Sequence, residues 1–475
     1  MATIDLEMTR IEGHMDVETT INNGRVVDAR IKGKMFRGLE NLLAGRHPVD
    51  ALRITQRVCG VCHEVHGIAS SLALEELYGV NPPRNGRILR DMILALHLAT
   101  DHLLHFYTLS LPDFVDFAPI LKYGGKDPEI NKLKDWVASR GPGFISGRAK
   151  GDYISSTSIC LPMITNYIKT LAIRARGGKG LAILGAKAPF AHALMPGGIT
   201  TSITPDRLMN FRSVVNEVHQ FVTTAYLPDV MTLASHFKKY FSIGVSHNNF
   251  YANESFSALG SPLIRSGVIL QGSREEFQPQ FVREEMTSSY YNPDFSPNPR
   301  KADGYSWSKS PRYKGQPLEV GPLARMMINR DELFQSMLKQ LGGSEGSSVM
   351  GRIVARAAET QLICEHIYKL LDSYELDAPT ITDIDFSRPV TGSGSGYSFA
   401  ARGALIHNVQ AKDGRIAKYN MIVPSTWNFG PRTETGLGVT EQALVGTPVE
   451  YGETDSVEVG RVVRSYDPCT ACAIH

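Results

Sequence analysis

Two Cys-x-x-Cys pairs at opposite ends of the chain constrain its fold more than any other feature. Cys59 and Cys62 form the first pair, and Cys469 and Cys472 form the second. This spacing lets the two sulfurs of a pair converge on one metal, so the two pairs together predict a four-thiolate site. A fold that makes such a site must bring the two ends of the 475-residue chain together.

The pairs alone leave three kinds of site open: structural zinc, a redox dithiol in each pair, and a catalytic metal. Zinc ribbons usually place their pairs about 15–20 residues apart, whereas about 400 residues separate these two. The neighbouring residues favour a catalytic metal, because Arg57 and His66 flank the first pair, and Asp467 and His475 flank the second. Such groups orient metal ligands and move protons, which a structural zinc site does not require.

The composition is that of a globular protein and argues against several other classes. The chain is 42% hydrophobic and 21% charged, and its formal net charge of +2 gives no reason to expect nucleic acid or an anionic membrane as a partner. No apolar run reaches the roughly 18 residues of a membrane span, and the N-terminus lacks the basic and apolar regions of a signal peptide. Six cysteines are too few for a disulfide scaffold. We expect Cys160 and Cys364 to be buried apolar side chains.

The patterning predicts an α+β fold that is predominantly α, with a long-helix bundle core and small β-sheets near the N- and C-terminal parts. We expect residues 1–475 to form a single fold. Its regions are an N-terminal β region over 1–50, a helical core over 51–380 with an irregular excursion at about 284–316, and a C-terminal β region with a metal-binding tail over 381–475.

Local signals mark individual elements. Asn22-Asn23-Gly24 between alternating apolar runs predicts a hairpin. Asp413-Gly414 separates two further predicted strands, and Thr204 before Pro205 predicts the start of a helix. The apolar residues recur at helical spacing over 88–111, 208–222 and 353–371.

The wider surroundings of the cysteines form a two-part motif. The first part reads Arg-x-Cys-Gly-x-Cys-x-x-x-His over 57–66, and the second reads Asp-Pro-Cys-x-x-Cys-x-x-His over 467–475. Together, in this order and at opposite ends, they resemble the paired signature of nickel–iron hydrogenase large subunits, with the respiratory uptake type the closest. Further segments similar to that family are 9–14, 36–40, 105–107, 305–307, 319–325 and 423–428.

The resemblance implies reversible heterolytic cleavage of H2 at a centre of one nickel and one iron, with CO and two cyanides on the iron. Cys59 and Cys469 would then be terminal nickel ligands, and Cys62 and Cys472 would bridge to the iron. Soft thiolates suit such a pair of metals, and an open position remains for H2. The other residues implied to contact this cofactor are Pro424, Ser425 and Arg402.

The resemblance also implies a magnesium ion near the C-terminus. Glu40 and His475 resemble its ligands, and the carbonyl of Met421 is a third candidate. An oxygen-rich octahedral site suits magnesium, although a histidine ligand is less usual. Taken without the family match, Glu40 is better read as a solvated loop carboxylate.

Arg402 matches the arginine that stands over the metals in that family. Asp113 and Asp467 match the carboxylates that hold it, although either residue taken alone is better read as a helix or turn cap. The family usually has an acidic residue, an alanine and a proline before this arginine, whereas this chain has Phe399, Ala400 and Ala401. Because proline would fix φ, its replacement by Ala401 leaves the placement of Arg402 less constrained.

The proton released by H2 cleavage needs a base and a way out. The family offers the terminal thiolate, here Cys469, and the arginine as candidate bases. Glu12 matches the glutamate that lies next to this cysteine, and burial would raise its pKa toward the working range. Read from the residues alone, Glu12 is better taken as a surface charge that opens a strand. His66 is the next candidate for a proton route.

The sequence further predicts a partner. Four of the six cysteines are committed to one site, so none are left to hold iron–sulfur clusters. We therefore expect an iron–sulfur small subunit in an obligate heterodimer, or in a dimer of heterodimers, and the family implies a maturation protease and metal-insertion proteins. The complex is expected in the periplasm, attached to the membrane through partner subunits, with the cytoplasm as the alternative. Two other functions stay open: a hydrogen sensor and a non-catalytic assembly subunit of the same fold.

Overall fold

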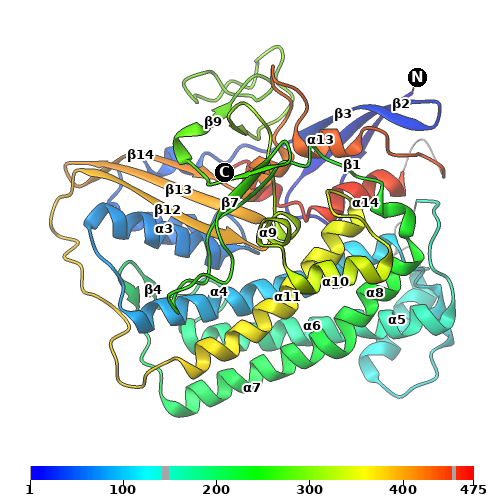
Figure 1. The fold of residues 1–475 in the computed structure, drawn as a ribbon, viewed down its shortest axis with the longest axis horizontal. Coiled ribbons are helices and arrows are strands. Elements are labelled where there is room, and N and C mark those ends of the chain that lie inside the picture. The colour runs from blue at the N-terminus through cyan, green and yellow to red at the C-terminus, as the bar shows by residue number, and fades with distance from the viewer. Residues whose placement is uncertain (1, 142–148, 452–455) are drawn as a thin grey trace.

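The computed structural model describes residues 2–141, 149–451 and 456–475, and Figure 1 shows how their elements are arranged. Long helices lie side by side along one side of the molecule, and small sheets lie on the other. The helices are α1 (Leu39–Leu43), α2 (Asp50–Thr55), α3 (His63–Tyr78), α4 (Arg84–Leu104), α5 (Pro128–Arg140), α6 (Thr157–Gly185), α7 (Pro205–Phe221), α8 (Leu227–His236), α9 (Pro322–Asn329), α10 (Glu332–Leu341), α11 (Val349–Asp372), α12 (Pro424–Phe429), α13 (Val439–Leu444), α14 (Val457–Ser465) and α15 (Thr470–Ala473). The strands are β1 (Ala2–Glu7), β2 (Met15–Asn22), β3 (Arg25–Gly33), β4 (Leu194–Met195), β5 (Gly198–Ile199), β6 (Phe250–Ala252), β7 (Gly267–Leu270), β8 (Ser273–Glu275), β9 (Val282–Glu285), β10 (Ser310–Tyr313), β11 (Glu319–Val320), β12 (Gly392–Ala400), β13 (Gly403–Lys412) and β14 (Arg415–Ile422).

The helix-rich α+β class is confirmed, and so are both predicted hairpins. β2 and β3 pair antiparallel across Asn23-Gly24, and β13 and β14 pair antiparallel across Asp413-Gly414. β1 and β12 each extend one of these hairpins to three strands. The structure adds a sheet that the sequence did not reveal, with strand order β11-β6-β7-β8, within the mainly helical region. Its strands have only two to four residues, which is too short for a period-2 pattern to stand out.

The predicted long helices are present as α4, α7 and α11. α4 does not end as a regular helix but continues as a π-helix over His105–Ser110 before it reaches Pro112. α7 begins at Pro205, yet the Thr204 hydroxyl donates a hydrogen bond to Asp206 and does not cap a backbone amide. The longest helix, α6, was not predicted, because Pro162 and a run of glycines interrupt its pattern.

The C-terminal sheet lies directly on α3, the helix that begins after Cys62. The contact strand β12 contains Gly-Ser-Gly-Ser-Gly over 392–396. A Cβ atom on Gly396 would lie 1.9 Å from the Ala69 carbonyl oxygen, and one on Gly394 would lie 2.1 Å from that of Ala73. Only glycine permits this backbone-to-backbone approach, so the glycine run fixes the position of α3 against the sheet.

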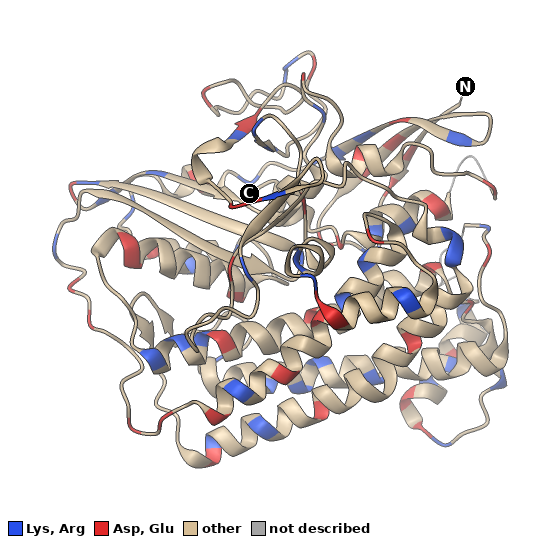
Figure 2. Cartoon of the chain, in the orientation of Figure 1, with Lys and Arg blue, Asp and Glu red and all other residues tan. Residues whose placement is uncertain are grey.

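One continuous apolar core joins the two ends of the chain. It extends from Met8 in the N-terminal segment to Cys472 in the tail, and it contains all four paired cysteines. Acidic and basic residues are interspersed along α7 and α11 (Figure 2), although Arg352, Arg356 and Glu359 of α11 are buried. Among the described residues, no helix is both long and apolar enough to cross a membrane.

Candidate metal centre

The two cysteine pairs meet in the interior. The four ligand sulfurs lie within 4.8 Å of one another, and each cysteine is at most 3% exposed. The Sγ atoms of Cys59 and Cys469 are 3.3 Å apart, and those of Cys62 and Cys472 are 3.0 Å apart. The first pair lies in the turn before α3, and the second pair brackets the start of α15. The predicted convergence of the four sulfurs is therefore confirmed.

The electrostatics of the four sulfurs favour a bound cation. Hydrogen bonding by Cys469 lowers the pKa of Cys59, so one thiolate forms readily. Burial raises the pKa of Cys469 and holds that of Cys472 well above its ordinary value. A bound metal cation would stabilise further thiolates at this site.

Arg402 stands at the tip of the β12–β13 hairpin, close enough to Cys62 and Cys469 to interact with them electrostatically. Its Nη2 donates to Asp467 Oδ1 at 2.9 Å, and its Nε donates to the Asp467 carbonyl at 3.0 Å. Asp101 on α4 lies 4.0 Å from its Nη1. Nη1 is buried without a hydrogen-bond partner, so it is free to donate to a group bound at the sulfurs.

The predicted contact between Asp113 and Arg402 is wrong. The Asp113 carboxylate is held by Arg10 and by Arg464, whose Nη1 lies 2.8 Å away. Asp101 is the second carboxylate near Arg402 instead. Sequence reasoning missed it, although a carboxylate on the apolar face of a predicted helix was a usable signal, because a buried carboxylate requires a cation.

Although Ala401 replaces the usual proline, hydrogen bonds hold the backbone before Arg402 in place. The Arg325 guanidinium donates to the carbonyls of Ala400 and Ala401 at 3.2 and 3.3 Å. Arg325 is itself fixed by the buried carboxylate of Glu359. A Cβ atom on Gly403 would lie 2.4 Å from the Val320 side chain, so the hairpin tip is also packed closely from the side of β11.

Ser425, at the start of α12, supports the second cysteine pair. Its hydroxyl accepts a hydrogen bond from the Cys469 amide at 3.1 Å. Pro424 is buried beside it and begins the helix. This brings Ser425, one of the three residues predicted to contact the cofactor, against the tail that carries Cys469.

Glu12 and His66 lie beside different cysteines of the centre. Glu12 is partly buried, and burial followed by the nearby Cys59 raises its pKa. The His66 ring lies 3.5 Å from Cys472 Sγ and is hydrogen-bonded to His407 Nε2 at 3.1 Å. Burial lowers the pKa of His66 to about 3, so its ring is neutral.

Glu40 and His475 are also brought together. His475 Nε2 lies 3.1 Å from Glu40 Oε1, and the Met421 amide donates to the same oxygen at 2.7 Å. Lys309, which belongs to no recognised motif, donates to both Glu40 oxygens at 2.9 and 2.7 Å. Burial alone would raise the pKa of Glu40, but Lys309 and His475 hold it well below its usual range.

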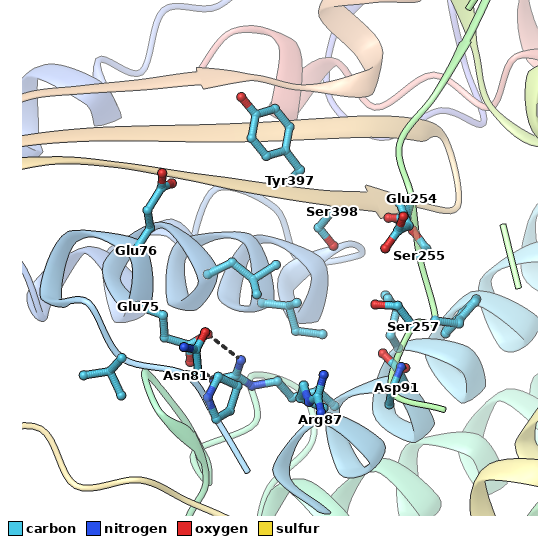
Figure 3. A pocket seen from close by; sticks show the side chains of 18 of the residues that line it. Glu75, Glu76, Asn81, Arg87, Asp91, Glu254, Ser255, Ser257, Tyr397 and Ser398 are labelled. Carbon is cyan, nitrogen blue, oxygen red and sulfur yellow. Dashed lines mark hydrogen bonds and ion pairs between the residues drawn. The ribbon is translucent and has the colours of Figure 1, made fainter. Parts of the chain in front are cut away.

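A separate cavity of about 520 Å³ lies between α3, α4, β12 and the segment around Glu254. Figure 3 shows Asp91 and Arg87 from α4, together with Tyr397 and Ser398 from β12, around this space. None of the four paired cysteines lines it, so it is distinct from the metal centre.

Comparisons with known proteins agree with this geometry. A model of the nickel-dependent hydrogenase family matches residues 37–475. The periplasmic [NiFeSe] hydrogenase large subunit of Desulfomicrobium baculatum is 35% identical, with 98% of this chain and 93% of that protein covered. The uptake hydrogenase large subunit of Rhizobium leguminosarum bv. viciae is 30% identical, with 98% and 94% covered. The solved structure of the Ni-Fe-Se hydrogenase from D. vulgaris Hildenborough in the as-isolated oxidized state is 34% identical, has a TM-score of 0.90 and is matched over 100% of both chains.

A buried four-cysteine centre that joins both ends of a helix-rich chain, near an arginine, defines a metal-dependent oxidoreductase of the hydrogenase class. The chain belongs to the nickel-dependent hydrogenase family, and it is a catalytic large subunit. The family prediction from the sequence is confirmed, and the matched relatives include uptake-type and [NiFeSe] chains alike.

Proposed function

We propose that this chain cleaves H2 reversibly and heterolytically at a nickel–iron centre held by Cys59, Cys62, Cys469 and Cys472. The observation that carries the proposal is the convergence of four buried sulfurs near Arg402, whose buried Nη1 has no hydrogen-bond partner. A single tetrahedral zinc would satisfy the sulfurs but leave this guanidinium nitrogen without an acceptor. CO and cyanide ligands on an iron would supply one. When bound, the centre supplies the open position at which H2 is polarised and split.

The roles of the surrounding residues follow from their contacts. Arg402 is a fixed positive charge near the sulfurs, because Asp467 holds both its Nε and its Nη2. A guanidinium stays charged, so in this proposal Arg402 orients H2 and stabilises developing charge while Cys469 accepts the proton. Ser425 keeps the Cys469 backbone in place.

Glu12 is the proposed next carrier of the proton. It lies beside Cys469 along a backbone bridge, and its carboxylate is partly buried near Cys59. Burial of this kind moves a carboxyl pKa toward the working pH, which a proton carrier requires. His66, kept neutral by burial, is the less suitable route.

We also propose that Glu40, His475 and the Met421 carbonyl hold a magnesium ion. The close approach of Glu40 Oε1 to His475 Nε2 supports a shared cation at this point. Its role would be to fix the tail that carries Cys469 and Cys472.

Electrons released at this centre must leave through a partner. We propose an iron–sulfur small subunit in a tight heterodimer, as expected for relatives that are named large subunits. A periplasmic complex is favoured by the name of the Desulfomicrobium baculatum relative. Cofactor insertion by maturation proteins belongs to the same proposal, as does the description of residues 1–475 as one large-subunit fold.

Infrared spectroscopy of the purified complex tests the centre, and steady-state H2 oxidation with an artificial electron acceptor tests the activity. We expect CO and CN stretching bands together with sustained turnover. Bound zinc without such bands would refute the nickel–iron centre. Bands with only very slow turnover would indicate a hydrogen sensor, and an assembly subunit would show neither bands nor turnover.

A further inference from the structure

Lys309 brings a buried ammonium into the proposed magnesium site. It precedes β10, and Glu284 lies on the paired strand β9. The Lys309 side chain is only 2% exposed. Its Nζ donates to both oxygens of Glu40, so the chain itself places a cation on a carboxylate that the metal would also need.

Glu284 offers the same ammonium a second position. Its Oε1 lies 3.6 Å from Lys309 Nζ. This oxygen is buried and has no hydrogen-bond partner, whereas Oε2 accepts from Asn420 at 2.7 Å. A buried carboxylate oxygen without a partner is costly, and a small movement of Lys309 would satisfy it.

Two cations on Glu40 repel each other, and the repulsion is stronger where water is excluded. A divalent ion between Glu40 and His475 therefore favours movement of Lys309 away from Glu40. Glu284 is the acceptor within reach. Either the Lys309 ammonium or the divalent ion can thus bind Glu40, and Glu284 can accept the ammonium when the ion displaces it.

We propose that Lys309 competes with the divalent cation for Glu40, and that it transfers its ammonium to Glu284 when the cation binds. The competition then weakens the apparent affinity of the site for the metal. The inference rests on the proposed magnesium site and makes Lys309 a positioning residue of that site.

Mg2+ affinity of the holoenzyme tests the competition directly. After dialysis against EDTA, Mg2+ binding is measured by calorimetry, and bound metal is counted by elemental analysis. Lys309→Met should bind Mg2+ about 10-fold more tightly or better, because a ligand binds more weakly when its competent state is only partly populated. Lys418→Met is the matched control: Lys418 lies over the same Phe295 ring as Lys309 but is exposed. We expect it to bind Mg2+ like the wild type.

Glu284→Gln tests whether Glu284 receives the Lys309 ammonium or only attracts Mg2+ through its negative charge. In the wild-type background it should weaken Mg2+ binding, because Lys309 loses its second position. In the Lys309→Met background the same change should have a much smaller effect, since no ammonium remains to be received. Equal effects in both backgrounds would overturn the transfer to Glu284.

The remaining outcomes separate the two proposals. If Lys309→Met binds Mg2+ no more tightly than the wild type, the competition is wrong while the magnesium site stands. If no variant binds Mg2+, the magnesium site itself is wrong, and the competition is wrong with it. Should Lys309→Met fail to fold, the conservative Glu284→Gln variant still decides, because unchanged Mg2+ affinity in that variant would overturn the proposal.

Discussion

Glu12 and Cys469 are joined backbone to backbone. The Glu12 amide donates to the Pro468 carbonyl at 3.2 Å, and the Thr470 amide donates to the Glu12 carbonyl at 2.7 Å. This parallel bridge connects the N-terminal segment to the tail that carries the second cysteine pair. The Glu12 side chain is therefore held beside the centre by its main chain, and it can be changed without breaking the connection.

Glu12→Gln should stop proton movement and leave the centre assembled. Glutamine has the same shape but cannot ionise, so we expect H2 oxidation and H/D exchange with solvent to fall by about 100-fold or more. Infrared bands of the centre should persist, and para-to-ortho conversion of hydrogen should be spared. Glu7→Gln, an exposed change in the same N-terminal segment, is the control. Wild-type exchange rates in the Glu12→Gln variant would show that the proton leaves by another route.

Substitutions around Arg402 distinguish Asp101 from Asp113. Arg402→Lys loses the pair of hydrogen bonds that Nε and Nη2 donate to Asp467. We expect turnover to fall by about 100-fold with the metals still present. Asp101→Asn should also lower turnover, because it removes a negative charge that lies 4.0 Å from Arg402 Nη1 and pairs with Arg174 at 2.8 Å. Asp113→Asn should lower thermal stability instead, since it loosens Arg10 and Arg464. The measurements are turnover per bound nickel and the unfolding temperature. A larger loss of turnover for Asp113→Asn than for Asp101→Asn would contradict this assignment.

Gly13→Ala should disturb the docking of the tail. Gly13 has φ +85°, and a Cβ atom there would lie 2.6 Å from the Ala471 nitrogen. Gly45→Ala is a matched control, because Gly45 has φ +78° with nothing within 4 Å of the added atom. The control should carry only the backbone cost of about 1 kcal/mol. Gly13→Ala should lower the unfolding temperature further and reduce nickel content. Equal behaviour of the two variants would mean that the close approach does not matter.

Asp91→Asn should change how stability depends on pH. Burial raises the pKa of Asp91 from 3.8 to about 7. The folded state therefore binds this proton more tightly than the unfolded state. The resulting stabilisation is complete below about pH 4 and is lost as the pH rises to about 7, by at most about 1.4 kcal/mol per unit. Asparagine can still accept from the Ala258 amide, which donates to Asp91 at 3.1 Å. The variant should thus have a flatter stability curve between about pH 4 and 7, whereas exposed Asp303→Asn should follow the wild type.

Local and short-range features could be predicted from the sequence. The hairpins at Asn23-Gly24 and Asp413-Gly414 were correct, because turn chemistry determines them within a few residues. The convergence of the cysteines is a long-range feature that was also correct, because metal chemistry leaves few uses for two such pairs.

Partners far apart in the sequence could not be predicted in the same way. The carboxylate near Arg402 was assigned to Asp113, whereas the packing of α4 brings Asp101 there. Lys309, which binds Glu40, lies close to Glu284 because β9 and β10 pair at the base of the irregular excursion. Neither residue stands in a pattern of its own, so only the tertiary structure reveals the contact.

The burial of the C-terminal tail has a consequence for how the metal centre is loaded and lost. Residues 456–475 are buried except for Ala471, which is partly exposed. The carbonyls of Ala471 and Ile474 are both held by Arg37. The sulfurs therefore have no direct access to bulk solvent while the tail is docked. Metal exchange must then follow the rate at which the tail opens, so retention of the centre is governed by a local unfolding barrier and not by the equilibrium affinity of the thiolates.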